Sequence, residues 1–143
     1  MQLTRAADYA VRVMIHLARL EPGLRASRGE LAAAAECPEQ FLAKVLQNLT
    51  HAGLVVSHRG NTGGFEIPAS RRETSLLEVV EALEGPIQLN LCLGTEDCSR
   101  KGWCPAHPIW ADAQKALVDV LRSKSISELA AASTPPEPVA VLM

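Results

Sequence analysis

Residues 38–67 of the chain have the sequence PEQFLAKVLQNLTHAGLVVSHRGNTGGFEI. The first half of this stretch spaces its apolar residues as one face of a helix. Pro38 suits the first position of that helix, and Gly53 suits its end. After Gly53, two short alternating segments, around Val56 and around Phe65, flank a glycine-rich stretch. The second half is therefore predicted to be a β-hairpin.

A shorter helix is expected directly before this one. Ser27 and Glu30 have the spacing of a capping box ahead of an alanine run, and Cys37 and Pro38 end that run. A short helix, a tight turn and a second helix with an amide-rich outer face indicate a helix-turn-helix. With a hairpin following at once, the pattern predicts a winged helix.

Helical spacing recurs elsewhere in the chain. The further predicted helices are about residues 4–20 with Thr4 as N-cap, residues 75–84, about residues 108–123, and a short helix to Ala132 with Ser127 as N-cap. The amphipathic helix 108–123 is appended to a small domain and needs a partner surface, for which a second copy is the simplest candidate. The expected fold is mainly α with a small β-hairpin wing: a winged helix-turn-helix plus a long C-terminal dimerisation helix.

Composition and charge narrow the class of protein. The chain has 143 residues, of which 48% are hydrophobic and 21% charged, and this balance excludes disorder. The formal net charge of -2 is the sum of a positively charged first half and a negatively charged second half. Residues 1–72 carry nine Lys and Arg against six Asp and Glu, whereas residues 73–143 carry five against ten. We expect any polyanion to bind the first half.

Three of the four cysteines form a metal-ligand pattern, Cys92-x5-Cys98-x5-Cys104-x2-His107. The apolar runs are too short for a membrane span and no export signal is present, so we expect the reducing cytoplasm, where disulfides are rare. Soft thiolates favour zinc or an iron–sulfur cluster, and the spacing leaves both open. His107 precedes a proline and has the alternative role of capping the long helix. Cys37 is expected to be a small buried residue.

Candidate DNA-binding side chains lie on the outer face of the second helix and in the hairpin. They are Gln40, Lys44, Gln47, Asn48, His58, Arg59, Gly60 and Asn61. Amides pair with adenine and Lys with guanine or phosphate, and Arg59 is placed to enter a minor groove or touch phosphate. The alternative for the helix face is an ordinary solvated surface. No arrangement of a nucleophile with a base is present, so an enzyme is not expected.

Three motifs together carry a family resemblance. They are Met1-Gln2-Leu3-Thr4 with Asp8-Tyr9-Ala10-Val11-Arg12, then His58-Arg59-Gly60-Asn61-Thr62-Gly63-Gly64-Phe65, and the three-cysteine loop. In this order they resemble the Rrf2-type winged-helix iron–sulfur transcription regulators, over residues 1 to about 132. The resemblance implies a homodimer on a palindromic DNA operator, with an iron–sulfur cluster bound by Cys92, Cys98 and Cys104.

The fourth cluster ligand differs among members of that family. His107 matches the histidine of the iron–sulfur assembly regulators, which carry a 2Fe–2S cluster. Asp8 matches the aspartate with which nitric-oxide sensors reach a 4Fe–4S cluster from the other subunit; from the residues alone, its default role is to complement a helix N-terminus. Gln40 and Lys44 match base-contacting positions of the assembly regulators, whereas Ala43 replaces their glutamate.

The sequence therefore predicts a dimeric transcriptional regulator, a repressor controlled by an iron–sulfur cluster that senses iron–sulfur status, redox state or nitric oxide. The alternative is a winged-helix protein whose Cys3His loop holds structural zinc and staples a dimer or a partner. The expected parts are a DNA-binding domain at residues 1–84, a cluster-binding loop at 85–107, the dimerisation helix and a short terminal helix at 108–132, and a disordered tail at 133–143.

Overall fold

The structure is a computed structural model that describes residues 2–132, so the predicted tail at 133–143 lies outside the described residues. Its regular elements follow the predicted order. They are α1 (Arg5–Arg19), α2 (Arg28–Ala35), α3 (Glu39–His51), β1 (Val56–His58), β2 (Gly64–Glu66), the 3-10 turn η1 (Ala69–Arg71), α4 (Leu76–Glu84), the 3-10 turn η2 (Leu91–Leu93), α5 (His107–Arg122) and α6 (Ile126–Ala132). No helix among these described residues is both long and apolar enough to cross a membrane.

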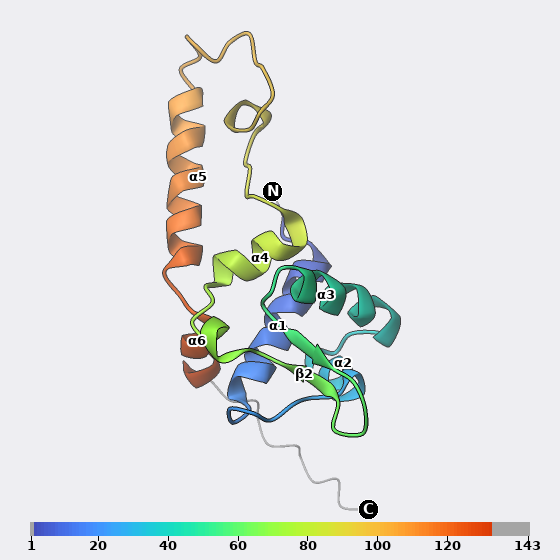
Figure 1. The fold of residues 1–143 in the computed structure, drawn as a ribbon. Coiled ribbons are helices and arrows are strands. Elements are labelled where there is room, and N and C mark those ends of the chain that lie inside the picture. The colour runs from blue at the N-terminus through green and yellow to red at the C-terminus, as the bar shows by residue number, and fades with distance from the viewer. Residues whose placement is uncertain (1, 133–143) are drawn as a thin grey trace, which may run out of the picture.

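Helix α1 forms the centre of the compact part of the molecule, with α2, α3, α4 and α6 packed around it (Figure 1). The Thr4 side chain accepts a hydrogen bond from the Ala7 amide and caps α1, as predicted. The largest fully buried side chains are aliphatic or Met, namely Met14, Leu17, Leu31, Leu42, Leu49, Ile126, Val13, Val45, Val55, Val79 and Val80. The fully buried part of the core is thus built from aliphatic side chains and Met14.

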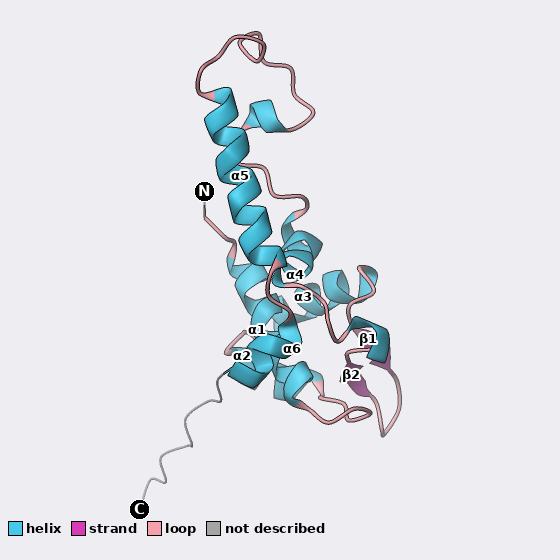
Figure 2. Cartoon of the chain, turned by 90° about the vertical axis from the view of Figure 1, so that its left-hand side faces the viewer, coloured by secondary structure: helices cyan, strands magenta, loops and turns pink. Residues whose placement is uncertain are grey.

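The wing is the two-stranded antiparallel hairpin of β1 and β2, with Val56 paired to Glu66 and His58 paired to Gly64. A second backbone contact joins it to the chain between α1 and α2. The Ala26 amide donates to the Phe65 carbonyl at 3.0 Å, and the Phe65 amide donates to the Ala26 carbonyl at 2.8 Å. The wing is therefore attached to the helical core along one side (Figure 2).

Helix α5 packs on the core only through its C-terminal half. There Leu117, Val118 and Leu121 contact a small cluster of Leu77, Val80 and Ile87 on α4 and the chain after it. The N-terminal half of α5 extends away from the core, together with the loop between α4 and α5 that contains Cys92, Cys98 and Cys104. We refer to this segment as the cysteine-bearing loop. Both lie at the opposite end of the molecule from the wing (Figures 1 and 2).

Two local predictions were wrong by one or two residues. The cap of α6 is Ser125, which accepts from the Glu128 amide, whereas Ser127 donates to Glu73. Pro38 is the N-cap of α3 and not its first residue. Helix α5 begins at His107, with Ala106 as its N-cap and Pro108 in its first turn, in agreement with the predicted start near residue 108.

Candidate DNA-binding surface and thiol pocket

Helix α3 separates its side chains into a buried and an exposed face. Leu42, Val45, Leu46 and Leu49 are buried against the core. Gln40, Lys44 and Gln47 are exposed on the other side, and Asn48 is half-buried beside them. The predicted base-contacting residues therefore share one accessible face of a helix that is held firmly from behind. This is the geometry with which a recognition helix enters a major groove.

In the wing, the structure separates the four predicted residues into two groups. Arg59, Gly60 and Asn61 are exposed in the turn. His58 is half-buried, and its Nε2 lies 2.6 Å from Oε1 of Glu66 on the neighbouring strand. Arg59 is thus free to contact a ligand, whereas His58 is engaged inside the wing.

A groove between α3 and the wing contains residues that the sequence interpretation missed. It has a volume of about 390 Å³, and its lining includes Arg28 from the start of α2, Gln47 and His51 from α3, and Ser57 from β1. Arg28 adds an exposed cation to the predicted surface. Arg28 could have been identified from the sequence by its position directly after the N-cap Ser27. The N-terminus of a helix attracts phosphate, and a cation beside it adds to this attraction.

The predicted metal ligands Cys92, Cys98, Cys104 and His107 line one pocket of about 440 Å³. Cys92 is buried in η2, Cys104 is half-buried and Cys98 is exposed on the loop. His107 lies in the first turn of α5, and its Nδ1 lies 3.4 Å from Sγ of Cys92. The imidazole therefore points to a thiol, and its alternative role as a helix cap is not what the structure displays.

The donor set of this pocket fits a thiolate-bound metal centre. All four cysteines of the chain are free. Arg100 and Lys101 also line the pocket and place positive charge beside thiols that ionise when they bind metal. Within residues 2–132, no group of three or more His, Cys, Asp or Glu side chains is arranged to hold a metal ion. The loop would have to close for the three thiols to meet at one centre.

Asp8 lies on a different part of the surface. It is in the first turn of α1, where a carboxylate complements the helix N-terminus, and its Oδ2 forms an ion pair of 2.9 Å with Nη2 of Arg12. The pocket it borders, with Arg5 and Glu36, is separate from the thiol pocket. Within one chain, the structure therefore groups His107 with the cysteines and does not group Asp8 with them.

Cys37 is buried between α2 and α3, as predicted. Its thiol donates weakly to the Pro38 carbonyl at 3.4 Å. Burial raises the pKa of the Cys37 thiol above its ordinary value, and the nearby charge of Arg12 offsets part of this increase. The side chain is thus a protonated, small apolar group of the core.

Two contacts fix the stem of the cysteine-bearing loop. Oε1 of Gln114, on α5, accepts from the Leu89 amide at 2.9 Å. At the end of α4, Oε1 of Glu84 accepts from the Thr4 amide at 2.5 Å. These contacts connect the loop to α5 on one side and to the start of α1 on the other.

These elements define a winged helix-turn-helix protein, a class of transcription regulators that bind DNA. A family model described as "Rrf2: Iron-dependent Transcriptional regulator" matches residues 3–132. The chain belongs to the Rrf2 family of transcription regulators, which are not enzymes.

Individual relatives support this assignment. The chain is 33% identical to the HTH-type transcriptional repressor NsrR of Streptomyces coelicolor over 138 residues, covering 95% of this chain and 93% of that protein. It is 27% identical to the HTH-type transcriptional regulator IscR of Vibrio vulnificus over 129 residues, covering 90% of this chain and 77% of IscR. The family resemblance inferred from the three motifs is confirmed.

A solved structure supports the fold in the same way. CymR (YrzC), described as the global cysteine regulator of B. subtilis, matches with a TM-score of 0.77 and 24% identity, over 94% of this chain and 99% of CymR. This similarity concerns the fold alone, and it confirms the predicted winged helix-turn-helix with a two-stranded wing.

Proposed function

We propose that this regulator is a homodimeric repressor whose affinity for a palindromic operator depends on an iron–sulfur cluster bound by Cys92, Cys98 and Cys104. One observation carries the proposal: three free thiols and an imidazole line a single pocket, in the loop that connects the DNA-binding part to α5. The Streptomyces coelicolor relative is a transcriptional repressor by name, which supports repression over activation.

In this proposal each subunit contacts one half-site. Gln40, Lys44 and Gln47 on the exposed face of α3 contact base edges in the major groove, with Asn48 beside them. Arg59, in the turn of the wing, contacts phosphate or the minor groove, where the narrow groove attracts a guanidinium group. Gly60 and Asn61 let the backbone of the turn approach DNA closely.

The second subunit is expected on α5. Ile109 and Val120 are 61% and 65% exposed, and Trp110 is also exposed, although none of them is polar. An apolar stripe of this kind on a long helix is typical of an interface between identical chains. Pairing through α5 would place the two recognition helices at a fixed separation, as a palindromic operator requires.

An iron–sulfur cluster supplies electron transfer and a reactive centre for oxidants or nitric oxide. In this chain, Cys92, Cys98 and Cys104 would hold it, and Arg100 and Lys101 would offset its negative charge. The fourth ligand is His107, from the same pocket, or Asp8, from the partner subunit. Separate His107→Ala and Asp8→Ala variants test the two candidates, because loss of the true ligand shifts the absorption spectrum of the cluster.

The position of the loop explains how ligand binding at the thiols can alter DNA binding. The loop begins where α4 ends at Glu84, and α4 packs on α1 and α3. It ends at His107, the first residue of α5. If the loop closes around its thiols, the position of the dimer helix α5 relative to the recognition helix α3 therefore changes. Because half-sites tolerate little change in spacing, a small displacement lowers affinity strongly.

Anaerobic purification tests the metal centre. We expect a coloured protein with iron and sulfide, whereas a colourless protein with zinc would support the structural Cys3His alternative. Cys98→Ala is expected to lose the iron and the visible absorption. Cys37→Ala is the matched control: its thiol lies in the core and not in the pocket, so the variant is expected to retain both.

Operator affinity at several salt concentrations tests DNA binding. We expect affinity to fall steeply as salt rises, since contacts by Lys44 and Arg59 release counterions from the phosphates. An affinity that hardly changes with salt would contradict this surface. The cluster dependence is tested separately, by comparing cluster-loaded and chelator-treated wild-type protein with Cys98→Ala. Equal affinities in all three would overturn the regulatory part of the proposal.

A further inference from the structure

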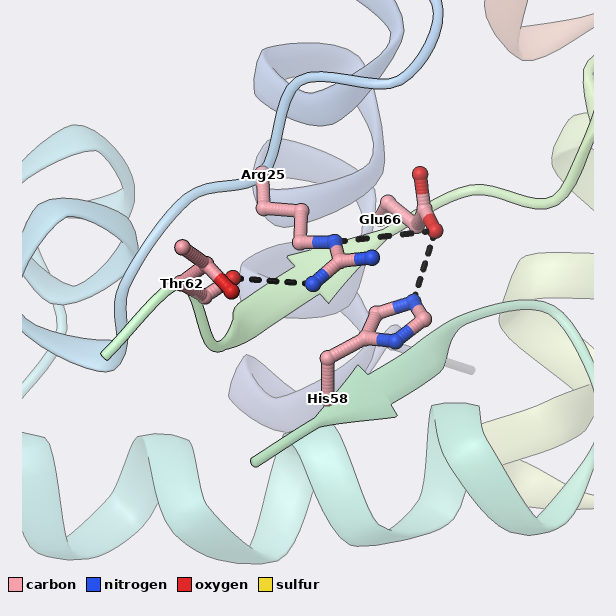
Figure 3. A network of polar contacts seen from close by, with 4 residues as sticks. All are labelled: Arg25, His58, Thr62 and Glu66. Carbon is pink, nitrogen blue, oxygen red and sulfur yellow. Dashed lines mark hydrogen bonds and ion pairs between the residues drawn. The ribbon is translucent and has the colours of Figure 1, made fainter. Parts of the chain in front are cut away.

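One polar network lies at the base of the wing and is formed by Arg25, His58, Thr62 and Glu66 (Figure 3). We refer to it as the wing-base network. Nη1 of Arg25 donates to the Thr62 carbonyl at 2.8 Å, and Nε of the same guanidinium lies 3.8 Å from Oε1 of Glu66. The same Glu66 oxygen lies 2.6 Å from Nε2 of His58. A single Arg from the chain before α2 therefore contacts the end of the wing turn and strand β2.

The backbone is in close contact at the same place. Residues Ala26 and Phe65 exchange both backbone hydrogen bonds, and Gly64 has a φ of +136°. A Cβ atom at position 64 would lie 2.8 Å from the Ala26 carbonyl oxygen. Glycine is thus required there for the chain before α2 to approach the wing closely enough for Arg25 to reach Thr62 and Glu66.

The hairpin alone is poorly suited to hold its turn in one orientation. The two strands pair over only three residue positions. An isolated two-stranded hairpin of this kind is marginal in water. The side chain of Arg25 adds a second point of attachment at Thr62, the residue that follows the exposed Arg59, Gly60 and Asn61 in the chain.

Glu66 is difficult to explain by charge alone. A carboxylate in a wing that meets DNA repels phosphate, so its removal should strengthen binding. Its oxygen, however, is engaged by two partners that come from different elements, Arg25 and His58. The contacts indicate that the carboxylate serves the wing itself.

We propose that Arg25 and Glu66 are positioning residues for DNA binding: together they hold the wing so that Arg59 reaches the DNA. This inference rests on the proposed contact between the wing and the operator. Arg25 acts through the shape of its guanidinium, which donates to the Thr62 carbonyl through Nη1 while Nε forms an ion pair with Glu66, and not through its charge on the phosphates. Glu66 acts by fixing that guanidinium and His58.

The sign of the Glu66→Gln effect separates positioning from electrostatics. If Glu66 positions the wing, Glu66→Gln weakens operator affinity by about tenfold, the scale of losing a charge-assisted hydrogen bond. If only charge matters, the same change strengthens binding. Glu39→Gln is the matched control, because Glu39 is an exposed carboxylate in the first turn of α3 that forms no ion pair with any described residue. We expect Glu39→Gln to leave affinity unchanged or slightly higher.

Arg25→Lys tests the guanidinium directly. Lysine keeps the positive charge but lacks the rigid guanidinium that reaches the Thr62 carbonyl and Glu66 at once, so we expect Arg25→Lys to lose as much affinity as Arg25→Gln, about tenfold. Near wild-type affinity for Arg25→Lys would show that Arg25 contributes charge only and would overturn the inference. Thermal unfolding of each variant checks that the core is intact.

A double-mutant cycle with Arg59→Ala completes the test. When Arg59 is absent, there is no wing contact left to position, so Arg25→Lys and Glu66→Gln should then change affinity by less than about twofold. Full additivity with Arg59→Ala would overturn the positioning role. If Arg59→Ala alone leaves affinity unchanged, the wing contact itself is wrong, which is a failure of the proposed function and is recognised from that single variant.

Discussion

The imidazole of His107 contacts the thiol of Cys92, with 3.4 Å between Nδ1 and Sγ. This contact joins the first turn of α5 to η2, two elements that are separated along the chain by the largely exposed residues of the cysteine-bearing loop. Cys92 is itself buried, and the imidazole of His107 covers one side of its thiol. The relationship exists within one chain and does not depend on a bound metal.

Removing this imidazole should expose the Cys92 thiol. We predict that His107→Ala, after treatment with a chelator, reacts at Cys92 about fivefold faster with a thiol reagent, which corresponds to the loss of one neutral hydrogen bond. Mass spectrometry of the labelled peptides assigns the rate to Cys92. His51→Ala, which removes an exposed histidine from α3, serves as the control and should leave the rate unchanged. Equal rates in both variants would show that the contact does not protect the thiol.

The helices were predictable from sequence because their signals are local. The N-cap at Thr4 and the cap at Ser27 depend on residues three positions apart, and both are present. The sequence predicted less well which residue near the start of the first strand faces the core. Alternation suggested Val56, yet Val55 is buried and Val56 is exposed, because Leu54 and Val55 both enter the core before the strand begins.

Other features depend on contacts between distant parts of the chain, which no short pattern contains. Ser125 caps α6, whereas the predicted cap was Ser127. The Ser127 hydroxyl instead donates a hydrogen bond to Glu73, 54 residues away. The role of Arg25 was not predicted for the same reason, because its partners lie in the wing, far from it in the sequence. In the cysteine-bearing loop, the spacing indicated a shared ligand set, and the structure adds that the four side chains line one pocket.

The exposed apolar stripe of α5 leads to a prediction about assembly. We expect Val120→Glu to weaken the dimer by at least about tenfold, because a carboxylate would be buried without a partner in the interface. Analytical ultracentrifugation measures the dissociation constant, and operator affinity should fall in parallel. Lys115→Gln is the control on the same helix: it removes only an exposed ion pair with Asp119, which contributes little. A dimer unaffected by Val120→Glu would place the interface elsewhere.

Burial of Cys37 predicts a pH dependence of stability. The pKa of this thiol is raised in the folded chain, so the unfolded chain loses the thiol proton first as pH rises. Its favourable contribution is complete below the ordinary thiol pKa of about 8.5 and is lost as pH rises towards the higher folded value. Urea unfolding between about pH 8 and pH 10 should therefore show a steeper loss of stability for wild type than for Cys37→Ala. Identical slopes would contradict this assignment.

The turn of the helix-turn-helix contains a strained residue. Glu36 ends α2 with a φ of 53° and a ψ of 47°, the left-handed conformation. It is the only non-glycine residue with positive φ among residues 2–132. Its amide donates to the carbonyls of Ala32 and Ala33, so the conformation closes the end of the helix. This position is the one at which helices most often use glycine.

Replacing Glu36 with glycine should therefore stabilise the protein. A left-handed conformation costs an L-residue about 1–2 kcal/mol, whereas glycine adopts it freely but has about 0.5–1 kcal/mol more backbone entropy to lose. We predict that Glu36→Gly raises the free energy of unfolding by about 0.5–1 kcal/mol, measured by urea denaturation. Ala34→Gly, an exposed position inside the same helix, should lower it by about 1 kcal/mol. If both glycines lower stability equally, the left-handed turn at Glu36 is not strained.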